Sequence, residues 1–228
     1  MKIDRRTTLA GLAALPATPF AMSSSGAFEQ LTVETTSGSY RGTKDNGILK
    51  FLGLRYGEDT RQTRFARPAP AKRHDGIVEA VSYGASAPQN GSPHVTDEDC
   101  LFLNIWTPGT DASAKRPVMV YIHGGAYAAG AGSDALYDGH RLAEKGDVVV
   151  VTLNHRLNAF GYISLSKIWP AQITDSGNAG QWDLVLALKW LSANVAAFGG
   201  DPSRVMLFGQ SGGGAKISNL MASPSAEV

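Results

Sequence analysis

The sequence of 228 residues predicts an α/β fold, in which a mostly parallel sheet carries helices on both faces. Three apolar runs have the composition of buried strands, and they cover residues 118–122, 147–152 and 205–208. Segments with helical character stand between or after these runs, at residues 135–145, 179–197 and 212–221. Because strand, helix and strand in this order connect by right-handed crossovers, the three strands should be parallel.

The extreme N terminus is predicted to be an export signal rather than part of the fold. Arg5 and Arg6 precede a short apolar run at residues 9–21, and this arrangement resembles a twin-arginine signal. Small residues around Ala21 and Ser23 are suited to cleavage. A Sec signal and a plain tail remain alternatives, and the run is too short for a stable membrane span. We therefore expect a signal at 1–23, a hydrolase domain at 24–228, and a periplasmic or secreted bacterial protein.

Residues 31–54 alternate as strands do and contain two turn signals, Ser37-Gly38 and Asn46-Gly47. They predict two hairpins that form a small antiparallel edge in front of the main sheet. A basic stretch follows, in which prolines interrupt the charges and Phe65 is the one aromatic residue. We interpret it as a solvated loop and expect no nucleic-acid partner. Its basic residues are Arg61, Arg64, Arg67, Lys72 and Arg73.

The strand at 118–122 runs into His123-Gly124-Gly125-Ala126-Tyr127, which has the composition of an oxyanion loop. Glycines leave backbone N–H groups open to a ligand oxygen, and such a loop acts together with the N–H of the residue after a nucleophile. That residue would be Gly212. We expect His123 to brace the loop and to take no part in proton transfer.

The helix at 179–197 is predicted to bury one side and to end at the glycines and proline of residues 198–202. Its expected buried side chains are Trp182, Leu186, Trp190 and Leu191. The strand at 205–208 then leads into Gly209-Gln210-Ser211-Gly212-Gly213, the Gly-x-Ser-x-Gly pattern of a nucleophile elbow. An ordinary glycine turn or a phosphate loop is the alternative, but neither phosphate-binding glycine pattern fits here.

Taken together, these blocks resemble the carboxylesterase type B family of α/β-hydrolases, from about Leu31 to the elbow. The resemblance implies the α/β-hydrolase fold and a serine carboxylesterase that acts on a small-molecule ester without cofactor or metal. The blocks that carry it occur in the family's order, and they are residues 98–104, 117–127, 154–156 with 160–161, 177–180 and 196–213.

The family's mechanism implies that Ser211 attacks the ester carbonyl and forms an acyl-enzyme. The N–H groups of Gly124, Gly125 and Gly212 would bind the oxyanion. The resemblance also implies a buried structural ion pair between Arg156 and Asp183.

The catalytic triad of this family is incomplete in the sequence, because its order is serine, then acid, then histidine. The 17 residues after Ser211 contain no histidine, and Glu227 stands too soon after the elbow to be the acid. His155 is interpreted as a packing or surface residue rather than a substitute base. We therefore expect a fold truncated after the elbow, with an open hydrophobic edge, poor stability and little activity for this chain alone.

Three departures from the family's usual residues narrow the range of expected substrates. Gln210 is neutral where members often carry Glu, Cys100 has no cysteine partner, and residues 87–100 contain no Phe, Tyr or Trp. The missing aromatic residue argues against a choline ester as substrate. The alternative function is a non-catalytic binding protein of the same fold, such as a neuroligin, or an inactive remnant. The oligomeric state is left open.

The composition agrees with a soluble globular domain, at 43% hydrophobic and 18% charged residues with a net charge of +1. This charge demands no strongly charged partner. One cysteine excludes an internal disulfide and a cysteine metal cluster.

Overall fold

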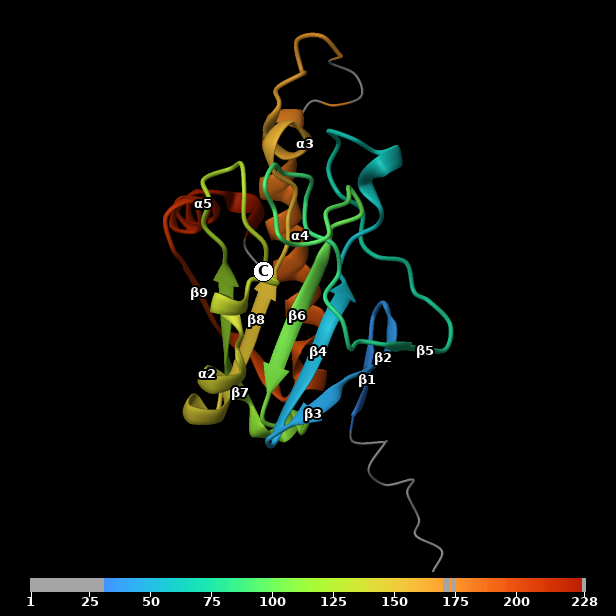
Figure 1. Ribbon diagram of the computed structural model, residues 1–228, viewed down its shortest axis with the longest axis vertical. Coiled ribbons are helices and arrows are strands. Elements are labelled where there is room, and N and C mark those ends of the chain that lie inside the picture. The colour runs from blue at the N-terminus through green and yellow to red at the C-terminus, as the bar shows by residue number, and fades with distance from the viewer. Residues whose placement is uncertain (1–30, 170–172, 174, 227–228) are drawn as a thin grey trace, which may run out of the picture.

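The structure is a computed structural model, and it describes residues 31–169, 173 and 175–226 (Figure 1). The export signal predicted at residues 1–23 lies outside the described residues. The described strands are β1 (Thr32–Thr35), β2 (Gly38–Arg41), β3 (Thr43–Asp45), β4 (Ile48–Arg55), β5 (Ile77–Glu79), β6 (Phe102–Thr107), β7 (Arg116–Ile122), β8 (Val149–Leu153) and β9 (Gly200–Gly209). The described α-helices are α2 (His140–Gly146), α3 (Asn158–Tyr162), α4 (Ala179–Asn194) and α5 (Gly212–Met221).

The main sheet has six strands in the order β3-β4-β6-β8-β7-β9. From β3 to β8 each strand pairs antiparallel with its neighbour, whereas the pairs β8-β7 and β7-β9 are parallel. The sheet is therefore mixed in the described residues, and its parallel half consists of the three runs that the sequence predicts as parallel strands. That half carries the candidate site.

Both predicted hairpins form, but they belong to different sheets. β1 and β2 pair antiparallel, and β5 adds to β2 in parallel to complete a three-stranded sheet. β3 and β4 turn at Asn46-Gly47, where φ is 45° and 90°, the left-handed values that a tight hairpin turn needs. This second hairpin extends the main sheet, so the expectation of one separate antiparallel edge is correct only for the first hairpin.

Helices cover both faces of the main sheet, as predicted. In Figure 1, α4 runs behind the strands and α2 lies in front of them. Leu184 and Leu188 of α4 join the larger apolar core with Val120 of β7, whereas Ala143 of α2 joins a smaller core with Trp106 of β6. The chain moves in opposite directions along the sheet through α2 and α4, so right-handed connections place the two helices on opposite faces.

The helix predicted at 135–145 is interrupted. A 3-10 turn at Ala135–Tyr137 is followed by extended Asp138, and α2 begins at His140. Gly139 explains the break, because a Cβ on it would lie 2.8 Å from the Val150 side chain and 2.9 Å from Trp106. The chain must therefore turn closely over the sheet before the helix can start.

The predicted helix over 179–197 is α4 followed by the 3-10 turn η5 (Val195–Phe198), which ends at left-handed Gly199. Trp190 and Leu191 are buried as predicted, whereas Trp182 and Leu186 are only partly buried. The Arg67 guanidinium lies 3.7 Å from the centre of the Trp182 ring, which explains why this tryptophan sits at the surface.

The basic stretch forms the expected solvated loop, and each of its five cations makes an ion pair while more than half of its side chain stays exposed. These pairs are Arg61–Asp59, Arg64–Glu98, Arg67–Asp175, Lys72–Glu58 and Arg73–Glu34.

Strand β9 lies at the edge of the main sheet, with β7 as its neighbour among the described residues. Val205 is 38% exposed and Met206 is 50% exposed, so the expectation that residues 205–208 form a fully buried strand is wrong in the described chain. An apolar run predicts a strand but not its place in the sheet. The open hydrophobic edge that the sequence also predicts is present here.

Candidate active site

The elbow forms where β9 ends and α5 begins. Helix α5 has the predicted bounds, whereas β9 begins five residues earlier and ends one residue later than the predicted strand at 205–208. Ser211 has φ 53° and ψ −119°, a strained conformation for a residue other than glycine. It stands at the N-cap position of α5, yet its hydroxyl makes no capping hydrogen bond. The Ser211 side chain is thus exposed and free to meet a ligand.

Glycines in the elbow allow it to contact the neighbouring strand and loop. A Cβ on Gly209 would lie 2.6 Å from the Ile122 carbonyl oxygen, and one on Gly213 would lie 2.0 Å from the same oxygen. A Cβ on Gly212 would lie 2.5 Å from the Cα of Ala126. No larger residue fits without displacing backbone, so these glycines bring the two sequence motifs together.

The loop at 123–127 supplies backbone N–H groups beside the elbow. A Cβ on Gly124 would lie 2.5 Å from the Gln210 Oε1, and Gly125 and Ala126 adopt left-handed φ values of 85° and 53°. Within the described chain, the N–H groups of Gly124, Gly125 and Gly212 donate to no protein acceptor. The three predicted oxyanion donors therefore lie on two segments that contact each other, and no acceptor within the described chain competes for their N–H groups.

His123 braces the loop, as its motif predicts, and His155 is a packing residue. The Nδ1 of His123 is 2.9 Å from the Gly124 carbonyl oxygen, and the two imidazole rings stack with centroids 4.8 Å apart. Burial lowers the pKa of His123 to about 4, and burial together with the neighbouring ring lowers that of His155 well below its usual value. Both rings are neutral at pH 7.

Lys216 of α5 is a residue of this region that the sequence reasoning missed. Its side chain is fully buried, and its Nζ donates a hydrogen bond of 2.7 Å to the carbonyl oxygen of Ala126. Burial lowers the pKa of Lys216 to about 8. A lysine in a glycine-rich helix normally signals the solvent-facing side, so no pattern in the sequence indicated this contact.

The ion pair implied by the family resemblance is present. Arg156 and Asp183 are almost completely buried, with Nη2 of the arginine 2.6 Å from Oδ1 of the aspartate. Arg156 Nη1 also donates to the Ala66 carbonyl, and the Arg156 backbone N–H donates to the carboxylate. Burial alone would lower the pKa of Arg156, but the Asp183 charge outweighs it and raises the pKa.

A catalytic base for Ser211 is missing from the described residues, where no side chain is hydrogen-bonded to its hydroxyl. Cys100 is buried as a free thiol, and burial raises its pKa well above the usual value. The described chain also contains no group of three His, Cys, Asp or Glu residues placed to hold a metal. The loop and elbow can hold an acyl group and its oxyanion, but proton transfer needs another group.

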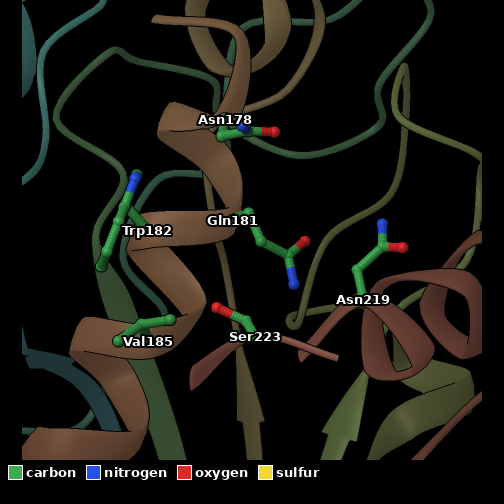
Figure 2. Close-up of a pocket in the computed structure, with 6 residues that line it drawn as sticks. All are labelled: Asn178, Gln181, Trp182, Val185, Asn219 and Ser223. Atoms are coloured by element: carbon green, nitrogen blue, oxygen red, sulfur yellow. The ribbon is translucent and has the colours of Figure 1, made fainter. Parts of the chain in front are cut away.

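A cavity of about 330 Å³ opens between α4 and α5, beside the helix that carries Lys216 (Figure 2). Gln181 reaches across from α4 and donates from Nε2 to the Lys216 carbonyl oxygen at 3.0 Å, while its buried Oε1 has no partner in the described chain. Ser211 is not part of the cavity wall. The residues lining it are Asn178, Gln181, Trp182, Val185, Asn219 and Ser223.

Comparisons with known proteins match the chain to one family. The family model described as "Carboxylesterase family" matches residues 29–228. The para-nitrobenzyl esterase of Bacillus subtilis is 44% identical over 204 residues, which cover 86% of this chain and 41% of that protein. The phenmedipham hydrolase of Pseudarthrobacter oxydans is 38% identical, and the match covers 84% of this chain and 40% of that protein.

Among solved structures, a carboxylesterase of Geobacillus stearothermophilus superposes with a TM-score of 0.84 at 42% identity, covering 87% of this chain and 41% of that one. This similarity confirms the predicted α/β-hydrolase fold. The chain thus spans about two fifths of the length of the relatives it matches. None of the helices in the described part of the chain is long and apolar enough to cross a membrane.

Proposed function

Because this chain belongs to the carboxylesterase family, we propose that the protein hydrolyses carboxylic esters through an acyl-enzyme on Ser211. The Ser211 oxygen bonds to the ester carbonyl carbon, and the carbonyl oxygen becomes an oxyanion. The N–H groups of Gly124, Gly125 and Gly212 bind this oxyanion, and the alcohol leaves with the serine proton. Water then hydrolyses the acyl group and restores the hydroxyl.

One observation carries the proposal: the strained backbone of Ser211 presents an uncapped hydroxyl at an elbow that contacts the loop at 123–127, and the N–H groups of Gly124, Gly125 and Gly212 have no acceptor in the described chain. Such strain persists only where surrounding structure imposes it, and it is concentrated at functional sites. A single oxyanion donor is worth about 3 kcal/mol of transition-state stabilisation. A protein that only binds partners has no chemical need for this arrangement.

Labelling with a fluorophosphonate probe tests the proposal, because the probe reacts with activated serine hydroxyls. We expect the product of the natural gene to be labelled at Ser211 and Ser211→Ala to be unlabelled. Ser218→Ala is the matched control, since Ser218 is an exposed serine of the same helix, and it should label normally. A folded natural product without labelling would refute the esterase proposal and favour the non-catalytic binding function.

The proposed substrate is an uncharged ester of a small alcohol. The loop at 87–100 offers no aromatic ring for a quaternary ammonium, and Gln210 places no negative charge beside the acyl site. A para-nitrobenzyl ester, the substrate named for the Bacillus subtilis relative, is a suitable test compound. Turnover of a choline ester at an equal rate would contradict this substrate class.

The proposed location is the periplasm or the cell exterior, reached through a cleaved signal at residues 1–23. Replacing Arg5 and Arg6 by lysine separates the two export routes, because only twin-arginine export depends on this pair. We expect the variant to accumulate inside the cell with its N terminus intact. Normal export of the variant would assign the signal to the Sec route, and an uncleaved N terminus in the wild type would refute a cleaved signal.

A further inference from the structure

Lys216 is a buried cation without a buried anion. Its side chain is fully buried in α5, five residues after Ser211, and no salt bridge joins it to a carboxylate in the described chain. Its Nζ instead donates to one neutral acceptor, the Ala126 carbonyl oxygen at 2.7 Å, and lies 5.3 Å from the centre of the Tyr127 ring. Burying an ammonium ion is costly unless it is paired, so this position needs a physical reason.

The acceptor of Lys216 is the residue at which the oxyanion loop touches the elbow. Ala126 has a left-handed φ of 53°, and a Cβ on Gly212 would lie only 2.5 Å from the Ala126 Cα. Contacts on either side hold the rest of the loop. The Gly125 carbonyl accepts from Ala128, and the Tyr127 carbonyl accepts from the Asn158 N–H at 2.8 Å. The peptide between Ala126 and Tyr127 is held by Lys216.

The charge of Lys216 also reaches the loop. Burial is the main cause of the low pKa of His123 and His155, and the positive charge of Lys216 lowers both values further. A cation that disfavours protonation of these two rings favours negative charge in the same region. An oxyanion bound by the loop would be such a charge.

We propose that Lys216 is a positioning residue that locks the loop at 123–127 against the elbow through the Ala126 carbonyl and adds a positive field that favours the oxyanion. This inference rests on the proposed esterase function and deepens it. Lys216 itself does not touch the reacting atoms. It acts through the loop whose N–H groups do.

The test compares Lys216→Met, which keeps the length and apolar character of the side chain but removes charge and donor, with Lys189→Met. Lys189 is an exposed lysine of α4 and serves as the matched control. Two measurements are made on the natural gene product and its variants. The first is hydrogen exchange of the peptide that contains residues 123–127, and the second is the rate of fluorophosphonate labelling at Ser211.

We expect Lys216→Met to exchange faster in this peptide than the wild type and to label about tenfold more slowly, less than the loss caused by removing a direct oxyanion donor. Lys189→Met should match the wild type in both measurements. An unchanged labelling rate in Lys216→Met would overturn the proposal. A wild type that is folded but unlabelled would refute the esterase function instead, and loop exchange alone would then decide the role of Lys216.

The pH dependence of labelling distinguishes the electrostatic effect of the Lys216 charge from the effect of its side-chain packing. We expect the wild-type rate to fall as pH rises through about 8, where Lys216 loses its charge, and this fall to be absent in the methionine variant. The titratable groups facing Lys216 are the Tyr127 phenol and the two buried histidines, His123 and His155, which are already neutral there. The same fall in labelling rate above pH 8 in the wild type and in Lys216→Met would refute an electrostatic effect of Lys216.

Lys216→Gln provides a second variant in case the methionine variant does not fold. Glutamine keeps an N–H donor but carries no charge, so its labelling should be slower than that of the wild type and should lack the fall above pH 8. Wild-type labelling at all pH values in Lys216→Gln would overturn the electrostatic part of the proposal.

Discussion

The molecule buries two cations in different ways: Arg156 is paired with Asp183 of α4, whereas Lys216 contacts a carbonyl of the loop at 123–127. Arg156 meets the Asp183 carboxylate through two of its nitrogens and also donates to backbone carbonyls. Lys216 meets one carbonyl oxygen and the face of a tyrosine ring. The pKa of Arg156 is raised and that of Lys216 is lowered, because only the arginine has a buried counter-charge.

Under the proposed role of Lys216, the contrast between the two cations separates a structural ion from a functional one. A fully paired buried ion is costly to break, since removing one partner leaves an uncompensated charge. A buried ion without a counter-charge contributes little to stability, so its presence calls for another explanation. The proposed role of Lys216 in positioning the loop at 123–127 supplies one.

The largest change in stability is expected for Asp183→Ala. The Arg156 guanidinium would stay buried without its carboxylate, so the free energy of unfolding should fall by about 3–5 kcal/mol. Asp175→Ala is the control, because its pair with Arg67 is partly exposed to solvent and should contribute less than about 1 kcal/mol. Urea denaturation measures both values. Equal effects for the two variants would show that Arg156 tolerates the loss of its partner.

Acidification should destabilise the protein through the two stacked histidines. In the folded state the pKa of His123 is about 4, against a usual value of 6.5. The unfolded chain therefore binds more protons between these values, and the free energy of unfolding should fall as pH drops from about 6.5 towards 4. His123→Phe should reduce this dependence. A pH profile identical to that of the wild type would mean that other groups cause the acid sensitivity.

At alkaline pH the titration of Lys216 should change the free energy of unfolding. The folded-state pKa of Lys216 is about 8, below its usual value of 10.5, so the unfolded state binds the extra proton between these values. The free energy of unfolding should therefore rise from pH 8 to 10.5 in the wild type, by more than in Lys216→Met. Denaturation curves at several pH values measure this difference. Parallel profiles would show that the lysine is solvated.

The smallest change in stability is expected for Lys216→Met at pH 7. The gain from removing a poorly paired buried charge offsets the cost of leaving the Ala126 carbonyl without a donor, so we expect a change of about 1 kcal/mol or less. Urea denaturation beside Asp183→Ala makes the comparison direct. A loss as large as that of Asp183→Ala would make Lys216 a structural anchor like Arg156.

Local elements and the residues of the two motifs can be predicted from the sequence alone. Helix α5 begins and ends at the predicted residues. The predicted hairpin turn forms at Asn46-Gly47, and both residues adopt left-handed φ values. The loop at 123–127 and Ser211 are likewise recognisable from their residue patterns. Helical periodicity, turn chemistry and glycine patterns act over a few residues, so a sequence displays them directly.

Tertiary packing decides which distant segments contact one another. Packing joins β3 and β4 to the main sheet, puts β9 at an exposed edge, and breaks the helix predicted at 135–145 where Gly139 crosses β8 and β6. It also stacks His123 on His155 and turns Lys216 into the interior, towards a carbonyl 90 residues away in the chain. Such contacts depend on the fit between distant segments, and no local pattern encodes them.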